Sequence, residues 1–204
     1  MSNLLEQAAH NLARNGFTVH IADSEAEAAD FLLREIPTDW SVGFGGSISL
    51  DQIGIYPKLA ERGNPVYWHW QSVPGLSRQE VQQKASTADA FLLSSNAITA
   101  SGAIVNTDGY GNRLAGLLYG HQRAFIVAGV NKLVPDLDAA RIRIANQAAP
   151  PNTRRLKLET PCAETGYCMN CDSPARICNA TLILHRQPGA VPITVCLVKR
   201  TLGF

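Results

Sequence analysis

Apolar positions alternate between helical spacing and short apolar runs through the first three quarters of the chain. Residues 4–12 carry apolar side chains at the three- and four-residue spacing of an amphipathic helix, and the β-rich run 17–21 follows. Compact apolar runs at 41–44, 90–93 and 124–128 predict buried strands. Because helices of about ten residues are predicted between strands along the chain, the pattern predicts βαβ units and a mostly parallel sheet covered on both faces.

The same pattern predicts further elements whose limits are less sharp. We expect a helix from about Ser47 to Gly63, and a strand at 66–70 that carries Trp68 and Trp70 on one face. A helix is predicted from Asp136 to about Ala148.

The last quarter of the chain looks different. The pair Pro150-Pro151 predicts a boundary, after which a cysteine-rich loop leads to strands at 181–184 and 193–198. The turn-like segment 187–190 between these strands predicts a terminal β-hairpin. We therefore expect one domain over 1–204, with an α/β core at 1–149 and an appended loop and hairpin at 150–204.

Composition and charge narrow the functional classes. The chain has 204 residues, 46% hydrophobic and 17% charged, with a formal net charge of +1, which are values of a globular protein. This balance favours neither nucleic acid nor an anionic membrane as a partner. No signal peptide or run of about 18 apolar residues is evident, so we expect a cytoplasmic protein without membrane insertion.

A glycine turn follows the predicted strand at 41–44. Gly45 and Gly46 permit close approach of a ligand to the backbone, and Ser47 and Ser49 add hydroxyl groups at the start of a helix, where the dipole favours anions. The alternative is a tight βα turn with a serine cap. Because open parallel sheets bind ligands at the carboxyl ends of their strands, we favour ligand binding.

A second polar segment, 94–113, predicts a binding crevice. Its directional hydrogen-bonding and charged residues are Asn96, Asn106, Asp108, Asn112 and Arg113. Ordinary turn chemistry is the competing interpretation for each residue taken singly.

A weaker candidate follows the strand at 124–128. Asn131 and Lys132 should reach the same sheet edge, where Lys132 is either an anion partner or a solvated lysine. The five histidines show no ligand spacing, and no arrangement of nucleophile and base identifies catalytic residues.

Four of the five cysteines lie on one short, turn-rich segment. They are Cys162, Cys168, Cys171 and Cys178, spaced C-x5-C-x2-C-x6-C. Such a set predicts a tetrathiolate site for zinc or an iron–sulfur cluster, which spacing alone does not distinguish. A dithiol–disulfide switch and coincidental structural thiols are the alternatives. Cys196 alternates with apolar residues in a strand, so we expect it in the core.

Together, the segments 42–54, 88–99, 102–113 and 160–178 resemble the LUD (lactate utilisation) domain family over nearly the whole chain. The resemblance implies a three-layer α/β/α sandwich of the superfamily of ribose-phosphate isomerases, glucosamine-phosphate deaminases and coenzyme A transferases (NagB/RpiA/CoA transferase-like). It also implies similarity to the small cytoplasmic proteins of a three-part bacterial system that oxidises lactate to pyruvate, in which iron–sulfur partners carry electrons.

The resemblance has limits that bear on activity. Related sugar-phosphate isomerases carry Gly-Ala-Asp where this chain has Ser95-Asn96-Ala97, and an amide cannot act as the carboxylate base. No glutamate is evidently placed as a transferase nucleophile, although Glu61 and Glu80 stay open.

Three hypotheses follow. The first is an accessory or redox component of L-lactate (hydroxy-acid) oxidation that binds a small anionic metabolite and works with iron–sulfur or dehydrogenase subunits. The second is a stand-alone enzyme acting on a phosphorylated or acyl substrate. The third is a non-catalytic ligand-binding or regulatory module. The sequence leaves a homo-oligomer open.

Overall fold

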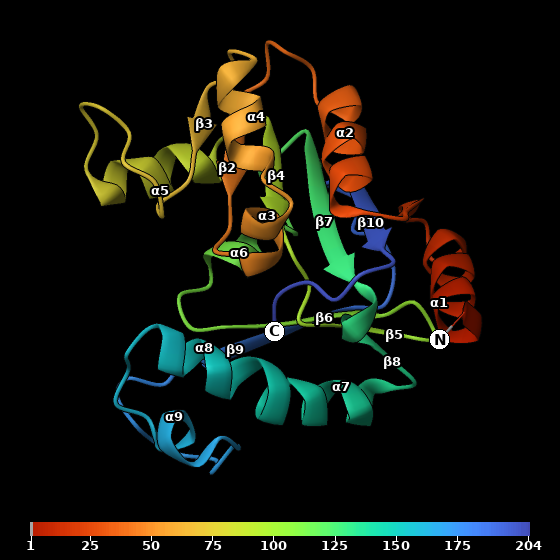
Figure 1. Cartoon of the computed structure of the whole chain (residues 1–204), viewed down its shortest axis with the longest axis vertical. Helices are drawn as coiled ribbons and strands as arrows, with labels where there is room; N and C mark the ends of the chain where they lie inside the picture. Colours follow the sequence, from red (N-terminus) through yellow and green to blue (C-terminus); the bar gives the residue numbers. More distant parts are fainter. Residues whose placement is uncertain (1) are drawn as a thin grey trace.

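The computed structural model describes residues 2–204 and is built on a six-stranded sheet in which every pair of neighbouring strands is parallel. The strand order is β1-β10-β7-β4-β2-β3 (Figure 1). The strands are β1 (Thr18–Ala22), β10 (Ile193–Val198), β7 (Arg123–Gly129), β4 (Ala90–Leu93), β2 (Val42–Phe44) and β3 (Val66–Tyr67). The predicted α/β class with a mostly parallel sheet is confirmed.

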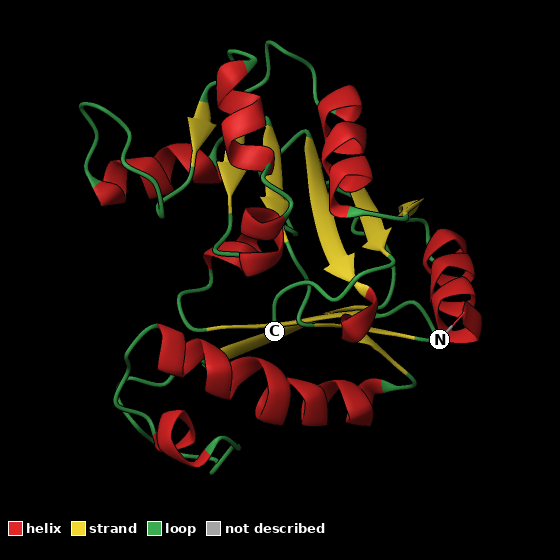
Figure 2. Cartoon of the chain, viewed as in Figure 1, coloured by secondary structure: helices red, strands yellow, loops and turns green. Residues whose placement is uncertain are grey.

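Helices flank this sheet and bury both of its faces, as a three-layer α/β/α sandwich requires (Figure 2). The first face packs against α2 (Glu25–Glu35), α3 (Ile48–Gln52) and α4 (Ile55–Glu61). The opposite face packs against α1 (Ser2–Arg14) and a second, smaller sheet. α5 (Arg78–Ser86) adjoins β2, and the short α6 (Asn112–Ala115) adjoins β6 (Ile104–Asp108).

The alternation of side chains along the central strand shows why these runs are apolar throughout. In β7, Phe125 and Val127 join the core beneath α2 and α4, whereas Ile126 and Ala128 join the core on the α1 side. Successive residues of a strand point to opposite faces, so a strand buried on both faces needs apolar residues at every position.

The smaller sheet was not predicted. Its order is β8-β5-β6-β9, with β5–β6 and β6–β9 antiparallel and β5–β8 parallel. Its strands are β5 (Ala97–Thr99), β6 (Ile104–Asp108), β8 (Leu133–Val134) and β9 (Ala180–Leu184). Its outer face packs against α7 (Leu137–Arg143) and the turn that follows it, where Ala140 and Ile144 contact the strands. The strand predicted at 181–184 is β9 of this sheet, whereas β5 and β8, with three and two residues, are too short to give a periodic signal.

The predicted terminal hairpin is wrong. β9 pairs with β6 in the smaller sheet, and β10 lies between β1 and β7 in the main sheet. The physical reason is burial: all six residues of β10 are buried, which a two-stranded hairpin cannot achieve. The C-terminal part of the chain therefore supplies a central strand of the core rather than an appended hairpin.

The pair Pro150-Pro151 lies within a helical segment rather than in a loop. α7 continues through the π-helix η2 (Ile144–Ala148) into α8 (Ala149–Arg155). Proline lacks a backbone N–H, and the irregular π-helical turn η2 directly before the pair is a place where a continuous helix can accommodate it. A short α9 (Pro161–Thr165) and the cysteine loop follow α8.

Two other predicted elements differ in extent. The helix expected at 47–63 is divided into α3 and α4 at Gly54, which adopts φ 63°. The strand expected at 66–70 ends at Tyr67, and Trp68 and Trp70 instead stack on each other in the following loop, with ring centroids 5.0 Å apart. No helix in residues 2–204 is long and apolar enough to cross a membrane.

Candidate functional site

A cleft of about 520 Å³ lies at the carboxyl ends of β2, β4 and β7. The loops after these strands supply its floor, and α8 and the segment 174–178 face them across the opening. In parallel sheets the loops after the strands converge at one edge, which explains why residues distant in sequence meet here.

Most residues predicted for ligand binding line this cleft. They are Gly46, Ser47, Ser49, Asn96, Asp108, Asn112, Arg113 and Lys132. Three predicted residues are not part of the lining: Gly45, Asn106 and Asn131. Each of these three residues instead supports a neighbouring residue that does line the cleft.

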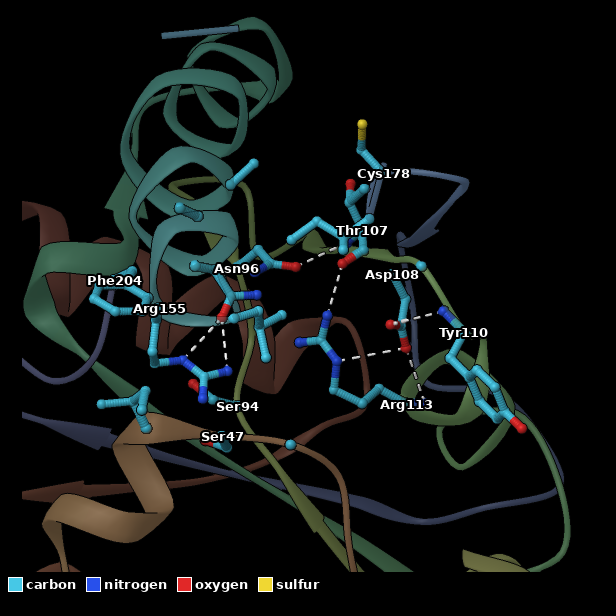
Figure 3. Close-up of a pocket in the computed structure, with 18 of the residues that line it drawn as sticks. Ser47, Ser94, Asn96, Thr107, Asp108, Tyr110, Arg113, Arg155, Cys178 and Phe204 are labelled. Atoms are coloured by element: carbon cyan, nitrogen blue, oxygen red, sulfur yellow. Dashed lines mark hydrogen bonds and ion pairs between the residues drawn. The ribbon is translucent and has the colours of Figure 1, made fainter. Parts of the chain in front are cut away.

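Arg113 is held in place from three sides. Its backbone N–H donates to Asp108 Oδ2 at 3.1 Å, its Nε lies 3.4 Å from the same oxygen, and its Nη2 donates to the carbonyl of Thr107 at 2.7 Å. The Asp108 and Arg113 side chains are only 10% and 16% exposed. Figure 3 shows the guanidinium group projecting into the cleft between these partners. Such an oriented group presents its remaining donors to an anion.

Gly45 makes room for this arginine. A Cβ at Gly45 would lie 2.7 Å from Arg113 Cγ, closer than side-chain atoms approach one another. The glycine therefore contributes space for the arginine stem rather than a contact with the ligand.

Asn96, in the loop after β4, is bonded to β6 through Asn106 and Thr107. Asn106 Oδ1 accepts from the backbone N–H of Asn96 at 3.0 Å, and Asn96 Oδ1 accepts from the N–H of Thr107 at 2.8 Å. Asn106 is 1% exposed and lies beneath the cleft surface, where it positions Asn96. Arg143 completes the support by donating to the carbonyls of Asn96 and Asn131 at 2.6 and 2.8 Å.

Asn131 holds the C-terminal segment over the site. Its Oδ1 accepts from the N–H of Leu202 at 3.0 Å. Gly203 and Phe204 then line the cleft. Asn131 thus has a supporting rather than a direct role.

Lys132 is the most deeply buried charged residue of the cleft wall, with 5% exposure. Its Nζ donates to Ser94 Oγ at 2.8 Å and to Ser49 Oγ at 3.1 Å. No carboxylate of the described residues forms an ion pair with it. Burial, followed by the charges of Arg143 and Arg113, lowers the pKa of Lys132 to about 7.

Sequence reasoning missed Arg155, which reaches the cleft from α8. Its Nε and Nη2 both donate to Asn152 Oδ1, at 3.2 and 2.8 Å, and its guanidinium lies 4.7 Å from the centre of a Trp70 ring. Arg78 and His69 also line the cleft. Burial, and then the charge of Arg78, lowers the pKa of His69. No periodic pattern marks Arg155, Arg78 or His69, because the segments that carry them meet only in the folded chain.

Positive charge dominates the lining. Its charged side chains are the cations Arg78, Arg113, Lys132, Arg155 and Arg176 and a single carboxylate, Asp108. Since Asp108 is already paired with Arg113, the cleft has an excess of positive charge. A small anion is the ligand class that this lining favours.

The four clustered cysteines surround a second, smaller cavity of about 20 Å³ beside α8. All are free thiols; Cys162, Cys171 and Cys178 are partly buried and Cys168 is exposed. Within residues 2–204, however, no three or more Cys, His, Asp or Glu side chains are grouped closely enough to hold a metal ion. The thiols thus share one cavity without forming a closed metal site.

Hydrogen-bond donors approach several of these sulfur atoms. Arg176 Nη2 lies 3.3 Å from Cys178 Sγ, and the backbone N–H of Asn170 lies 3.4 Å from Cys168 Sγ. The hydroxyl of Thr160 lies 3.4 Å from Cys162 Sγ. N–H groups directed at sulfur stabilise thiolate ligands, so the donor type and surroundings suit a tetrathiolate site.

Comparison with known proteins identifies the family. The model of the LUD domain matches residues 5–198. The chain belongs to the LUD domain family. A crystal structure of a DUF162 family protein from Deinococcus radiodurans is similar over 97% of both chains, with a TM-score of 0.59 and 14% identity, which supports the fold alone. No curated protein matches the chain.

In this LUD domain the two cavities share a wall. Ala149, Arg176, Ile177 and Cys178 line both the cationic cleft and the cysteine cavity. Figure 3 shows Cys178 near Thr107 and Asp108 at the edge of the cleft. Arg176 fixes this wall by donating to the carbonyls of Cys171 and Cys178 at 2.7 and 3.1 Å. A structural change in one cavity can therefore affect the other directly through these shared residues.

Proposed function

We propose that this LUD domain is an accessory or redox component of bacterial L-lactate (hydroxy-acid) oxidation to pyruvate. In this proposal the cationic cleft binds the carboxylate of the hydroxy acid or its 2-oxo product. The four clustered cysteines hold an iron–sulfur cluster or zinc. Iron–sulfur and dehydrogenase subunits are the expected partners.

The cleft supports the first half of the proposal through its charge and hydrogen-bonding groups. Arg113 and Arg155 extend from opposite walls, and each is held by a neighbouring side chain (Figure 3). Arginine binds carboxylates by two parallel hydrogen bonds, and the serine hydroxyls of the floor suit a neighbouring hydroxyl or carbonyl oxygen.

The cysteine cavity supports the second half. Cys162, Cys168, Cys171 and Cys178 would hold the metal, with Arg176 balancing the negative charge of the thiolates. A bound iron–sulfur cluster would supply one-electron chemistry, whereas zinc would only stabilise the loop.

The observation that carries the proposal is the shared wall. Arg176 and Cys178 belong to both cavities, so a ligand in the cleft would lie beside the thiolate site. Proximity of a substrate to an electron carrier is the arrangement that a redox component needs.

Anaerobic purification followed by metal analysis and calorimetric titration tests the proposal. We expect iron with acid-labile sulfide, or zinc, at one site per chain, and saturable binding of L-lactate or pyruvate. An R113Q variant should lose most of the affinity for the anion and keep its metal, whereas R123Q should keep both. Arg123 is the matched control because its ion pair with Glu35 lies outside the cleft lining.

Two results would contradict the proposal. Protein that folds without metal even after anaerobic reconstitution with iron and sulfide or with zinc would remove the metal site. Metal-loaded protein that binds neither compound would remove the hydroxy-acid ligand while leaving the cysteine site intact.

A further inference from the structure

A separate feature of the cleft floor is a cluster of two serines and one lysine from three different loops. Lys132 Nζ donates to Ser94 Oγ at 2.8 Å and to Ser49 Oγ at 3.1 Å, and the two hydroxyl oxygens lie 3.3 Å apart. All three side chains are buried, and all three line the cleft. A carboxylate partner would keep the amine charged, and no such partner is found among the described residues.

The two serines are not equivalent. Ser94 is 5% exposed and Ser49 is 1% exposed, and Ser94 has the shorter contact with the lysine. The backbone of Gly203 also covers Ser49, because a Cβ on Gly203 would lie only 2.8 Å from Ser49 Oγ. Ser94 is therefore the more accessible of the two serines, and Ser49 accepts a second hydrogen bond that positions the Lys132 amine.

Lys132 has the properties of a base. Its burial and the nearby cations Arg143 and Arg113 favour the neutral amine, which can accept a proton near neutral pH. A serine hydroxyl is a weak nucleophile until an adjacent base accepts its proton, and Ser–Lys pairs perform this chemistry in unrelated proteins.

We propose that Ser94 and Lys132 form a nucleophile–base pair that accepts an acyl group from an anionic ester or thioester. Ser94 Oγ attacks the acyl carbonyl carbon while its proton passes to Lys132 Nζ. The bond to the leaving alcohol or thiol then breaks, and that group leaves with the proton from Lys132. Water or an acceptor hydroxyl releases the acyl group by the same steps in reverse, which regenerates the free serine.

The surroundings define the substrate class. Arg113 and Arg155 favour a negative charge on the acyl donor, because they line the same cleft as the nucleophile. Asn96 also lines the cleft near Ser94, and its side-chain amide offers a donor for the oxygen that becomes negative during attack. The cleft volume of about 520 Å³ suits a donor larger than a hydroxy acid. This activity needs neither the cysteine site nor lactate, so it is independent of the function proposed above.

The test uses mono-4-nitrophenyl succinate, an activated ester with a free carboxylate. Mixed with the full-length protein, it should give a burst of 4-nitrophenolate approaching one equivalent per chain. Peptide mass spectrometry should then find one succinyl group on Ser94. S94A should abolish the burst, and K132M should slow it by roughly 100-fold or more, the usual contribution of a general base. K84M, at an exposed helical position, should label at the wild-type rate.

Further variants separate chemistry from folding. S94C should restore labelling as a thioester, which a purely structural serine would not do. S49A should retain labelling at Ser94 at a rate reduced several-fold. Folded wild-type protein without a burst, a succinyl group on Lys132 in place of Ser94, or an S94A variant that reacts at the wild-type rate would each overturn the proposal.

Discussion

The cationic cleft and the cysteine cavity are neighbours, but only in the cleft are the functional side chains already held in position by the protein. In the cleft, Arg113 and Lys132 are positioned by hydrogen bonds to side chains from other elements, and both are largely buried. Around the cysteine cavity, Cys168 is exposed and the four thiols are not grouped closely enough to hold an ion. The cleft is preorganised, whereas the cysteine loop would gain its final order from a bound metal.

The largest expected effect comes from replacing a cysteine of the central pair. C168S or C171S should lose most of the metal and lower the thermal stability of the metal-loaded protein, because metal-binding energy contributes to folding. Metal analysis and thermal unfolding measure both effects. C196S is the control: its side chain lies in the core between β1 and β7, so it should keep its metal. Equal metal content in C168S, C171S and wild type would contradict a tetrathiolate site.

The second largest effect is expected from a substitution in the cleft, which should change anion binding without changing the metal content. R113Q should weaken binding of pyruvate by about 1.5–3 kcal/mol, the usual contribution of a hydrogen bond to a charged group. Its metal content should be unchanged, and calorimetry and metal analysis on the same sample check both. If R113Q loses metal but still binds the anion normally, the roles assigned to the two cavities are wrong.

Lys132 gives the folding stability a pH dependence that originates in the cleft. Since the folded-state pKa of about 7 is lower than the ordinary value of 10.5, the unfolded chain binds more protons between these two pH values. Stability from this group should therefore rise with pH above about 7, with a limiting slope of ~1.4 kcal/mol per pH unit. Urea unfolding between about pH 6 and 9 should show this slope in wild type and a flatter profile in K132M. Identical slopes would show that the lysine is not buried as described.

A smaller effect is expected at Trp70. W70L removes the ring against which Arg155 stacks at 4.7 Å, and it leaves the hydrogen bonds from Arg155 to Asn152 intact. The affinity for the anion should fall by about 0.5–1 kcal/mol, the usual strength of such a contact at a partly exposed site. W40L, a partly buried tryptophan that packs against the core outside the cleft lining, is the matched control for calorimetry. An unchanged affinity in W70L would remove Arg155 from the binding site.

The smallest effect concerns Cys196, whose thiol is expected to be inert. Burial, followed by the charge of Glu27, raises the pKa of the Cys196 thiol to about 12. Iodoacetamide should modify the metal-free cysteine loop rapidly at neutral pH and leave Cys196 untouched until the protein unfolds. Mass spectrometry of the labelled peptides gives the result, and rapid labelling at Cys196 in the folded state would contradict its burial.

The sequence predicts the parts of this structure that depend on local patterns. Apolar runs such as 124–128 identify the strands of the main sheet, and the glycine turn and the segment 94–113 identify the cleft floor, because parallel strands bring these loops to one edge. The position of β10 is not predictable in this way. Its apolar residues suit any buried strand, and only the completed sheet selects the place between β1 and β7.

The cleft residues that the sequence did not indicate were missed for the same reason: only the completed fold brings them together. Arg155 and Trp70 are brought together by packing between α8 and a loop about 85 positions earlier, which no local pattern records. Arg143 did leave a signal: it shares the helix face of Ala140 and Ile144, and a charged residue on a buried face indicates a structural task. That task is to hold the carbonyls of Asn96 and Asn131.

Arg176 and Cys178 form the wall that the two cavities share, and backbone NMR can follow both residues during titration. Titration with pyruvate should shift the amide signals of both residues together with those of Gly46 and Asn112 in the cleft, and separate titration of the metal-free protein with Zn²⁺ should shift Arg176 and Cys178 again. If pyruvate shifts only the cleft signals, or if Zn²⁺ leaves Arg176 and Cys178 unchanged, the two cavities do not act as one functional unit.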